Sequence, residues 1–390
     1  MNPLIIVGAG MAGITVAREF RKLDKTTPIV LVTRDAGGFY SKPMLSNALA
    51  QNKAAAQLQS QSAAQLSASL PCTILSHTEV TGIDTVTQHI SVRNAEGEAS
   101  HAYANLVLAP GAQPIRLAIS GDAADQVLSV NHLDDYAQFR QRLEAIPGKA
   151  RVALLGAGLI GCEFADDLAG AGYAVTLIDP NPLPLAALSP APIGQGLQAA
   201  LEARGVRLQL GTTAQSIDHA DGALCLALAN GQTLLADLVL SAVGLRADVA
   251  LAQAAGLRCE RGIVLDAVGQ TSAPHVYALG DCAQYSLADG SSRTLPYIAP
   301  IMAAGRALAK TLSGTPTPID LKPAPVIVKT PSYPVALVAP SSASQGEWQH
   351  EARETGCVSR FVAADGKVTG FAMAQQDAAT RSALMAELAP

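Results

Sequence analysis

Two glycine-rich fingerprints have the residue types and spacing that hold the pyrophosphate of a dinucleotide. They are Gly8, Ala9, Gly10, Met11, Ala12, Gly13 and Gly156, Ala157, Gly158, Leu159, Ile160, Gly161. The first glycine permits a tight turn after a buried strand, the second lets a pyrophosphate approach the backbone, and the third lets the next helix pack closely. A glycine-rich turn without a ligand is the alternative for either motif alone. Two such motifs, each after an apolar run, predict two dinucleotide cofactors and electron transfer between them.

The residue at the end of the second strand differs between the two units. In the second unit it is Asp179, where a carboxylate binds ribose hydroxyls and repels a 2′-phosphate. No Lys or Arg occurs from residue 152 to residue 203, so we expect NADH rather than NADPH. The alternative is that Asp179 only caps the turn before Pro180. The first unit has Thr33 at this position, followed by Arg34 and Asp35, and so departs from the expected acid.

The elements that must position these motifs follow an alternating pattern. Residues 4–33 predict strand, helix and strand, with the helix over 12–23, and residues 151–243 repeat this plan. Residues 50–70, rich in Ala, Gln and Ser, predict an exposed helix. Strands over 326–329, 335–338, 357–363 and 368–374 predict a small C-terminal α+β domain. The expected fold class is α/β, with two Rossmann-like dinucleotide-binding domains and this tail.

Bulk composition excludes several classes of protein. A chain of 390 residues predicts two or three domains, and 49% apolar with 15% charged residues allows a large core. The net charge of −5 argues against general nucleic-acid binding. No apolar run approaches the roughly 20 residues that span a bilayer, and no basic leader opens the chain. We therefore expect a cytoplasmic protein that is a monomer or a weak dimer.

The cysteines do not have the spacing of a redox dithiol or a zinc site. They are Cys72, Cys162, Cys225, Cys259, Cys282 and Cys357. No pair forms a CxxC or CxxxxC motif, so we expect no metal site. All six are predicted to be small buried hydrophobic residues.

The motifs together resemble the FAD-dependent pyridine nucleotide–disulfide oxidoreductase-like family. The segment 271–281 resembles the family's FAD signature, and segments 106–111 and 238–244 resemble its crossover strands. Segments 40–46, 156–165 and 328–331 are similar to the rubredoxin–NAD reductases of this family, and the likeness covers essentially the whole chain. Residues 37–71 contain no cysteine, which disfavours the disulfide-reducing and peroxide-reducing branches.

The resemblance implies a domain plan. Residues 1–115 and 245–320 form the FAD-binding domain, residues 116–244 the NADH-binding domain, and residues 321–390 the C-terminal domain. Besides the first fingerprint, it implies an FAD site formed by Thr33, Arg34, Lys42, Val80, Glu163, Asp281, Ile298 and Lys329. The NAD site it implies contains Gly156, Gly158, Leu159, Ile160, Gly161, Asp179 and Gly244.

Three of these residues, and the start of one helix, also have an expected role. By resemblance Asp281 binds the ribityl chain, and a helix beginning at Pro300 stabilises anionic charge near the flavin. Lys42 beside a flavin stabilises negative charge on the reduced ring, and Glu163 at the flavin face is a candidate partner for Lys42. The alternatives are a solvated loop cation for Lys42 and helix N-terminal charge complementarity for Glu163.

The activity implied by the resemblance is transfer of a hydride from NADH to FAD, and then of single electrons to rubredoxin for alkane hydroxylation. A hydride carries two electrons, whereas a rubredoxin iron takes one electron at a time. Flavin can do both, so it links two-electron transfer to single-electron transfer. Rubredoxins are typically acidic, so the candidate docking cations are Arg306, Lys310, Lys322 and Lys329. The alternative for each of them is an ordinary solvated cation. For the activity itself, the alternatives are a ferredoxin or flavorubredoxin reductase, an NADH oxidase or peroxidase, and a binding protein that responds to redox state.

Overall fold

The computed structural model describes residues 1–287, 290–341 and 344–388, which belong to two compact units. Unit 1 contains Met1–Ser41, Gln59–Gln113 and Leu245–Lys322. Unit 2 contains Lys42–Leu58, Pro114–Gly244 and Pro323–Pro390. Each unit is therefore assembled from segments that are distant in the sequence.

Unit 1 is built on a five-stranded parallel sheet in the order β20-β9-β1-β2-β5. Its strands are β1 (Leu4–Val7), β2 (Ile29–Val32), β5 (Thr73–Leu75), β9 (Asn105–Leu108) and β20 (Val276–Ala278). β1 and β20 are buried along their lengths, and so are the apolar residues 106–108 of β9, as expected for parallel strands covered on both faces.

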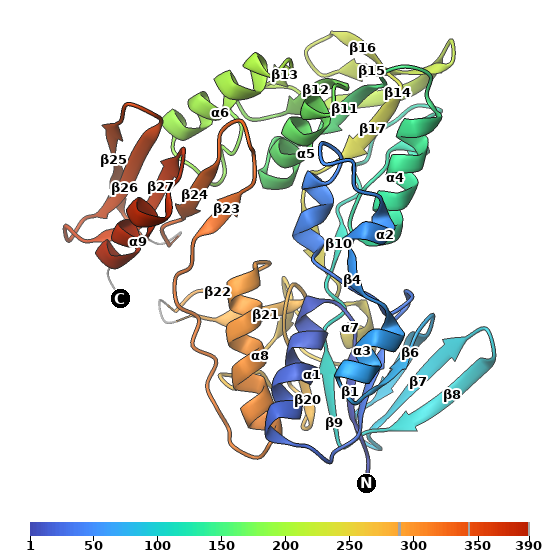
Figure 1. Cartoon of the computed structure of the whole chain (residues 1–390). Helices are drawn as coiled ribbons and strands as arrows, with labels where there is room; N and C mark the ends of the chain where they lie inside the picture. Colours follow the sequence, from blue (N-terminus) through green and yellow to red (C-terminus); the bar gives the residue numbers. More distant parts are fainter. Residues whose placement is uncertain (288–289, 342–343, 389–390) are drawn as a thin grey trace. The chain divides into compact units, whose positions relative to one another are not determined.

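Two helices of unit 1 lie side by side, α1 (Met11–Leu23) and α8 (Ile298–Leu312) (Figure 1). Gly305 permits this close approach, because a Cβ there would lie 2.6 Å from Cγ2 of Thr15. The start of α8 and the first fingerprint therefore both belong to unit 1.

The remaining elements of unit 1 are short. They are β3 (Phe39–Tyr40), β4 (Gln59–Gln61), α3 (Ala63–Ser69), β6 (Glu79–Asp84), β7 (His89–Asn94), β8 (Gly97–Ala102), β10 (Ala112–Pro114), β18 (Leu245–Ala247), α7 (Ala250–Ala254), β19 (Ile263–Val264), β21 (Ala283–Ser286) and β22 (Ser292–Thr294). They form the small sheets β6-β7-β8, β19-β21-β22, β3-β4 and β10-β18.

Unit 2 repeats the dinucleotide-binding plan with a parallel sheet in the order β13-β12-β11-β17. Its strands are β11 (Arg151–Leu155), β12 (Ala174–Asp179), β13 (Arg207–Leu210) and β17 (Leu238–Ser241). The helices are α2 (Ala55–Leu58), α4 (Leu133–Ala145), α5 (Leu159–Gly170) and α6 (Ala191–Ala203), with 3-10 turns η1 (Lys42–Asn47) and η2 (Ala124–Gln126). An antiparallel sheet of β14 (Ala214–Ala220), β15 (Ala223–Leu228) and β16 (Thr233–Ala236) completes this part.

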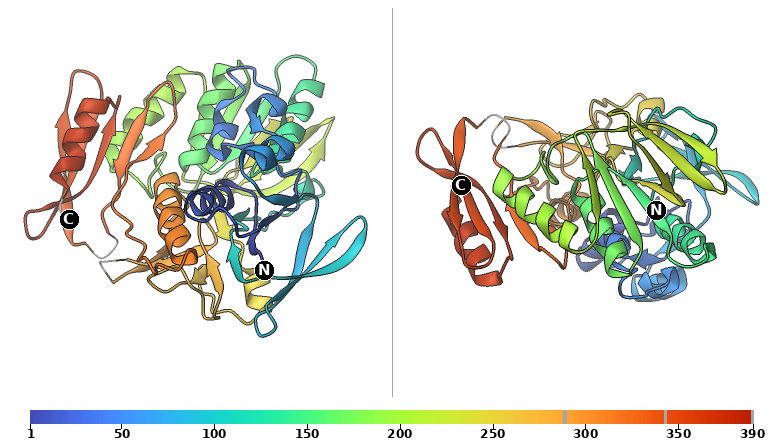
Figure 2. Two further views of the ribbon diagram at one scale, coloured as in Figure 1. Left: turned by 60° about the horizontal axis from the view of Figure 1, so that its bottom comes forward. Right: turned by 90° about the horizontal axis from the view of Figure 1, so that it is seen from above.

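The C-terminal part of unit 2 is a five-stranded antiparallel sheet in the order β23-β24-β27-β26-β25. Its elements are β23 (Val326–Val328), β24 (Val335–Val338), β25 (Gly346–Ala352), β26 (Cys357–Ala363), β27 (Val368–Ala374) and α9 (Ala378–Glu387). Helix α9 covers one face of the sheet (Figure 2), where Leu384 packs in a core with Phe371 and Met373. The predicted α/β class with a small α+β tail is confirmed.

Two local predictions need correction. Residues 50–70 are not one helix, because β4 pairs with β3 and a capping box at Ser62 starts a separate helix. Nor is this segment wholly exposed, since Leu66 and Leu70 are buried. Helix α8 begins at Ile298, two residues before Pro300.

Candidate dinucleotide-binding sites

The first fingerprint has the geometry of an open cradle. Gly8 follows β1 with φ +107°, and a Cβ there would lie 2.2 Å from the Ala109 carbonyl oxygen. A Cβ on Gly13 would lie 2.0 Å from the Gly8 carbonyl oxygen, so this glycine permits contact between helix and turn. At Gly10, by contrast, a Cβ would meet no described heavy atom within 4 Å other than those of its chain neighbours. The open space at the middle glycine fits the approach of a pyrophosphate.

The second fingerprint repeats these features. Gly156 has φ +101°, and a Cβ on Gly161 would lie 1.8 Å from the Gly156 carbonyl oxygen. Gly158 again has no described heavy atom within 4 Å of its built Cβ. Gly10 and Gly158 are the N-caps of α1 and α5, and within the described chain no side chain caps either helix. Both helix ends therefore present backbone N–H groups and a positive dipole end to an anion.

Asp179 is fixed at the carboxyl end of β12, beside the second cradle. Its Oδ2 accepts a hydrogen bond of 2.6 Å from the Ala157 N–H. Its Oδ1 accepts bonds of 2.8 Å from both the backbone N–H and the side-chain amide of Asn181. Asp179 therefore caps the turn, and the same hydrogen bonds hold its carboxylate next to the second fingerprint.

The corresponding position of unit 1 is organised differently. The buried Thr33 donates its hydroxyl hydrogen to Oδ1 of Asp35 at 2.8 Å, and the Gly37 N–H donates to the same oxygen. Arg34 extends to Asp248, with 3.4 Å between Nη2 and Oδ2. Asp35 therefore stabilises the turn after β2, and Arg34 is the polar side chain that reaches outward.

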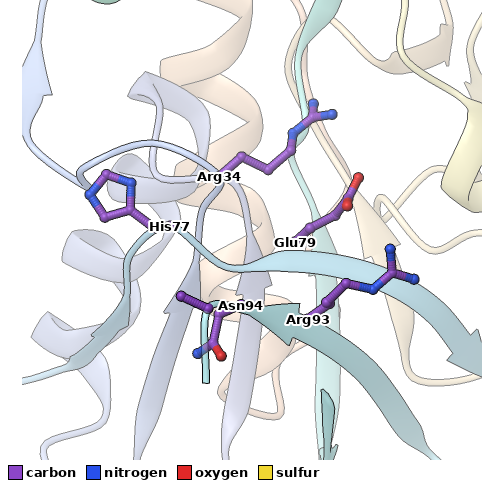
Figure 3. Close-up of a pocket in the computed structure, with 6 residues that line it drawn as sticks. Arg34, His77, Glu79, Arg93 and Asn94 are labelled. Carbon is purple, nitrogen blue, oxygen red and sulfur yellow. The ribbon is translucent and has the colours of Figure 1, made fainter. Parts of the chain in front are cut away.

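An open hollow of about 310 Å³ lies beside this turn (Figure 3). It is lined by Arg34, His77, Glu79, Arg93, Asn94 and Ala95. In the view of Figure 3 the Glu79 carboxylate lies between the guanidinium groups of Arg34 and Arg93. Val80, the next residue of β6, is half-buried. Of the predicted FAD residues, Arg34 lines the hollow, and Val80 is the chain neighbour of its lining residue Glu79.

The loop that carries Asp281 approaches the first fingerprint. Gly280 has φ +82°, and its built Cβ would lie 2.8 Å from the Cβ of Ala12 in α1. The Leu279 N–H donates to the Leu108 carbonyl oxygen at 3.2 Å, which continues the pairing of β20 with β9. Asp281 therefore follows the same edge of the parallel sheet at which Gly8 follows β1. Ile298, at the start of α8, is 45% exposed.

Glu163 of α5 lies at the centre of a buried polar cluster in unit 2. Its side chain is fully buried, and both carboxylate oxygens lie 2.6 Å from Nζ of Lys329. The Lys329 backbone N–H donates to Oε1 at 2.8 Å, and the Ser46 hydroxyl donates to Oε2 at 2.5 Å. The sequence suggests Lys42 as the cation partner of Glu163, whereas the structure brings Lys329 to it.

Two further acids of α5 are functional candidates that the sequence reasoning missed. Asp166 and Asp167 are buried, and each accepts backbone N–H groups from a distant segment. Their spacing in the sequence could have indicated them, because acids at 163, 166 and 167 share one face of a helix. The spacing alone did not identify their partners.

The predicted FAD residues fall in both units. Unit 1 contains the first fingerprint with Thr33, Arg34, Val80, Asp281 and Ile298, and unit 2 contains Lys42, Glu163 and Lys329. All predicted NAD residues are in unit 2, including Gly244, which has φ +112° at the end of the crossover after β17.

The prediction that all six cysteines are buried is wrong for four of them. Cys162 and Cys282 are buried, and Cys72, Cys225, Cys259 and Cys357 are partly exposed. Burial raises the pKa of the Cys282 thiol to about 12, so this thiol is inert. All six are free thiols.

Among the described residues, no group of three or more His, Cys, Asp or Glu side chains is arranged to hold a metal ion. In that same part of the chain, no helix combines the length and the apolarity needed to cross a membrane.

Comparison with protein families gives two matches along the chain. Residues 2–304 match the model described as pyridine nucleotide-disulphide oxidoreductase. Residues 318–388 match the model described as rubredoxin binding C-terminal domain.

Individual relatives agree with these matches. A rubredoxin-NAD(+) reductase of Acinetobacter baylyi is 41% identical, covering 100% of this chain and 98% of that protein. A nitric oxide reductase FlRd-NAD(+) reductase of Aeromonas salmonicida is 40% identical, covering 94% of this chain and 92% of that protein. Among solved structures, a ferredoxin reductase from Rhodopseudomonas palustris superposes with a TM-score of 0.89 at 25% identity, covering 100% of this chain and 96% of that one.

Proposed function

The chain belongs to the pyridine nucleotide-disulphide oxidoreductase family and is an oxidoreductase, and from this premise we propose that it is an FAD-dependent NADH:rubredoxin oxidoreductase. Family membership implies FAD and a nicotinamide dinucleotide. The observation that carries the proposal is the pair of cradles, each with open space at its middle glycine. Two pyrophosphate sites in one chain suit a protein that passes electrons from one dinucleotide to the other.

We assign FAD to the first cradle and NADH to the second. In this assignment residues 1–115 and 245–320 are the FAD-binding domain, residues 116–244 the NADH-binding domain, and residues 321–390 the C-terminal domain. The adenosine part of FAD lies by Thr33 and the hollow at Arg34, Val80 is a neighbour of the flavin, and Asp281 binds the ribityl chain. This choice is supported by the loop at Gly280, which approaches Ala12 of the first fingerprint helix.

When bound, FAD accepts a hydride's two electrons together and releases them singly. The protein binds and orients this group and sets its reduction potential. Lys42 and Lys329 supply positive charge for the reduced ring, and Glu163 holds the Lys329 ammonium in one position. The start of α8 at Ile298 adds the positive end of a helix dipole. No side-chain base is required for hydride delivery.

The preference for NADH over NADPH rests on the charges around the second cradle. Asp179 presents a carboxylate next to Ala157, where a 2′-phosphate would be repelled. The first cation after the cation-free stretch is Arg204, whose Nε lies 2.7 Å from Asp166. We expect NADH to bleach the flavin in anaerobic stopped-flow at least about tenfold faster than NADPH at equal concentration. Faster reduction by NADPH would refute this assignment.

Rubredoxin is the proposed acceptor of the electrons that leave the flavin. Rubredoxin is favoured by the rubredoxin-binding domain match, and flavorubredoxin by relatives of nearly equal identity. Offering rubredoxin, ferredoxin, flavorubredoxin and oxygen in parallel to the purified protein with NADH decides between them. We expect turnover within the 1–10³ per second range of typical enzymes for rubredoxin and slower rates for the others. Alkane hydroxylation is the pathway we propose for these electrons.

In addition to the matched residues 318–388, we propose that the exposed face of α8 takes part in docking an acidic rubredoxin. Arg306 and Lys310 are exposed and one helical turn apart, and no ion pair within the described residues engages either. On the C-terminal sheet, by contrast, Arg360 is paired with Glu351 and Glu387.

The double substitution Arg306→Glu with Lys310→Glu is expected to lower kcat/KM for rubredoxin about tenfold at low salt, because steering by complementary charge is lost. Lys25→Glu is the matched control, since Lys25 is another exposed cation of unit 1. Steady-state rates over a salt series provide the measurement, with ferricyanide as an acceptor that needs no docking. A double variant with wild-type salt dependence would contradict docking on α8.

A further inference from the structure

Helix α5 carries three buried carboxylates that hold two distant parts of unit 2. Glu163 accepts hydrogen bonds from Ser46 and Lys329. Asp166 accepts from the Ser332 N–H at 2.9 Å, and Arg204 lies against its other oxygen. Asp167 is bonded to the segment that follows η1. The helix that starts at the second cradle is therefore the common anchor for the segments that carry Lys42 and Lys329.

Asp167 binds the segment that directly follows the Lys42-bearing turn η1, whereas Glu163 binds Ser46 within that turn. Oδ2 of Asp167 accepts the Leu49 N–H at 2.8 Å and its Oδ1 accepts the Ala50 N–H at 3.0 Å. The carboxylate is only 5% exposed. Burial raises the pKa of Asp167 above its ordinary value, with the charge of Asp166 adding to the rise, while the N–H donors oppose it. A buried acid with two backbone donors is a strong and directional support.

The same segment is held from its other side by α4. The Tyr136 hydroxyl and Nη1 of Arg140 donate to the Lys53 carbonyl oxygen at 2.8 Å and 2.6 Å. Nη2 of Arg140 donates to Oδ1 of Asn52 at 2.6 Å. Residues 42–53 are thus bonded to two helices of unit 2, although the predicted domain plan places them in the FAD-binding domain.

We infer that Asp167 is a positioning residue that fixes the Lys42-bearing turn on the helix of the second cradle. This inference rests on the proposed function, in which Lys42 stabilises negative charge on the reduced flavin. Asp167 acts through Lys42 and does not touch the cofactor. An amide in its place offers one acceptor oxygen and turns its NH₂ group toward a backbone N–H, so the segment loses one of its two hydrogen bonds to this side chain.

The test is a double-mutant cycle on the FAD-loaded protein, with the flavin midpoint potential measured by dye equilibration. We expect Asp167→Asn to lower the potential by about 30 mV, a tenfold shift of the two-electron equilibrium. Lys42→Gln should lower it by at least as much. The double variant should equal Lys42→Gln alone, because effects that act through one residue do not add. Thermal unfolding is followed in parallel, and the exposed Asp125→Asn is the control for removal of a carboxylate from unit 2.

Arg140→Gln is the second variant, in case Asp167→Asn folds poorly. It loosens the same segment from α4 and should lower the potential in the same direction by a smaller amount. Wild-type potentials in the folded variants, or additive shifts in the double variant, would overturn the inference. If wild-type protein does not bind FAD or is not reduced by NADH, the proposed function fails instead.

Discussion

We expect Gly158→Ala to raise the KM for NADH about 100-fold, or about 2.7 kcal/mol of binding free energy, while FAD stays bound. Apart from its chain neighbours, no described heavy atom lies within 4 Å of the Cβ that alanine would add, so the substitution fits the protein itself. Gly158 has φ −73° and ψ −171°, which alanine adopts freely. The methyl group instead occupies the space through which the pyrophosphate reaches the backbone N–H groups.

Gly10→Ala is the reciprocal variant and tests the assignment of the two cradles. Its Cβ also meets no described heavy atom within 4 Å, so it should fold and purify with little FAD. Steady-state kinetics with NADH and the ratio of flavin to protein absorbance are the measurements. Loss of FAD from Gly158→Ala with an unchanged KM for NADH would show that the assignment is reversed.

Gly161→Ala separates ligand binding from folding. Its Cβ would lie 1.8 Å from the Gly156 carbonyl oxygen, so the helix must move away from the turn. Overpacking of this kind costs about 1–3 kcal/mol or more of unfolding free energy. Thermal unfolding should therefore respond to Gly161→Ala and only weakly to Gly158→Ala. Gly158 and Gly161, two glycines of one fingerprint, then have distinguishable roles.

The sequence predicted the features that depend on neighbouring residues. An apolar strand, a Gly-x-Gly-x-x-Gly turn and a helix are consecutive, so the cradles follow from local geometry. The same holds for Asp179, because the end of β12 is fixed by the pairing of β12 with β11. Four strands of the C-terminal sheet were also predictable, since turn residues such as Gly366 separate them, but the fifth strand, β25, was not predicted.

Contacts between distant residues were not predictable from one sequence. Glu163 and Lys329 are 166 positions apart, and nothing local distinguishes Lys329 from Lys42 as the partner. The membership of residues 42–58 in unit 2 also depends on contacts between distant residues, which Asp167, Tyr136 and Arg140 make. Burial of the cysteines was overestimated, because strand residues such as Cys225 alternate between a covered and an open face.

The Glu163–Lys329 pair gives the second large expected effect. Glu163→Gln should lower the free energy of unfolding by about 2–3 kcal/mol, somewhat below the 3–5 kcal/mol typical of breaking a fully buried pair. The expected loss of unfolding free energy is smaller because the Lys329 side chain is 30% exposed and water partly solvates it. The new amide also turns an NH₂ group toward the Ser46 hydroxyl or the Lys329 N–H. Denaturant unfolding of the FAD-loaded protein measures the loss.

The same variant should raise the flavin midpoint potential, opposite in sign to Asp167→Asn. Without its carboxylate, the Lys329 ammonium is an uncompensated positive charge and stabilises negative charge on the reduced ring. Glu163→Gln with Lys329→Met removes both charges, so it should recover part of the stability and return the potential toward the wild-type value. A loss of stability with no change in potential would mean that the pair supports the fold of unit 2 and does not act on the flavin. The sign of the potential shift therefore distinguishes a structural ion pair from one that tunes the cofactor.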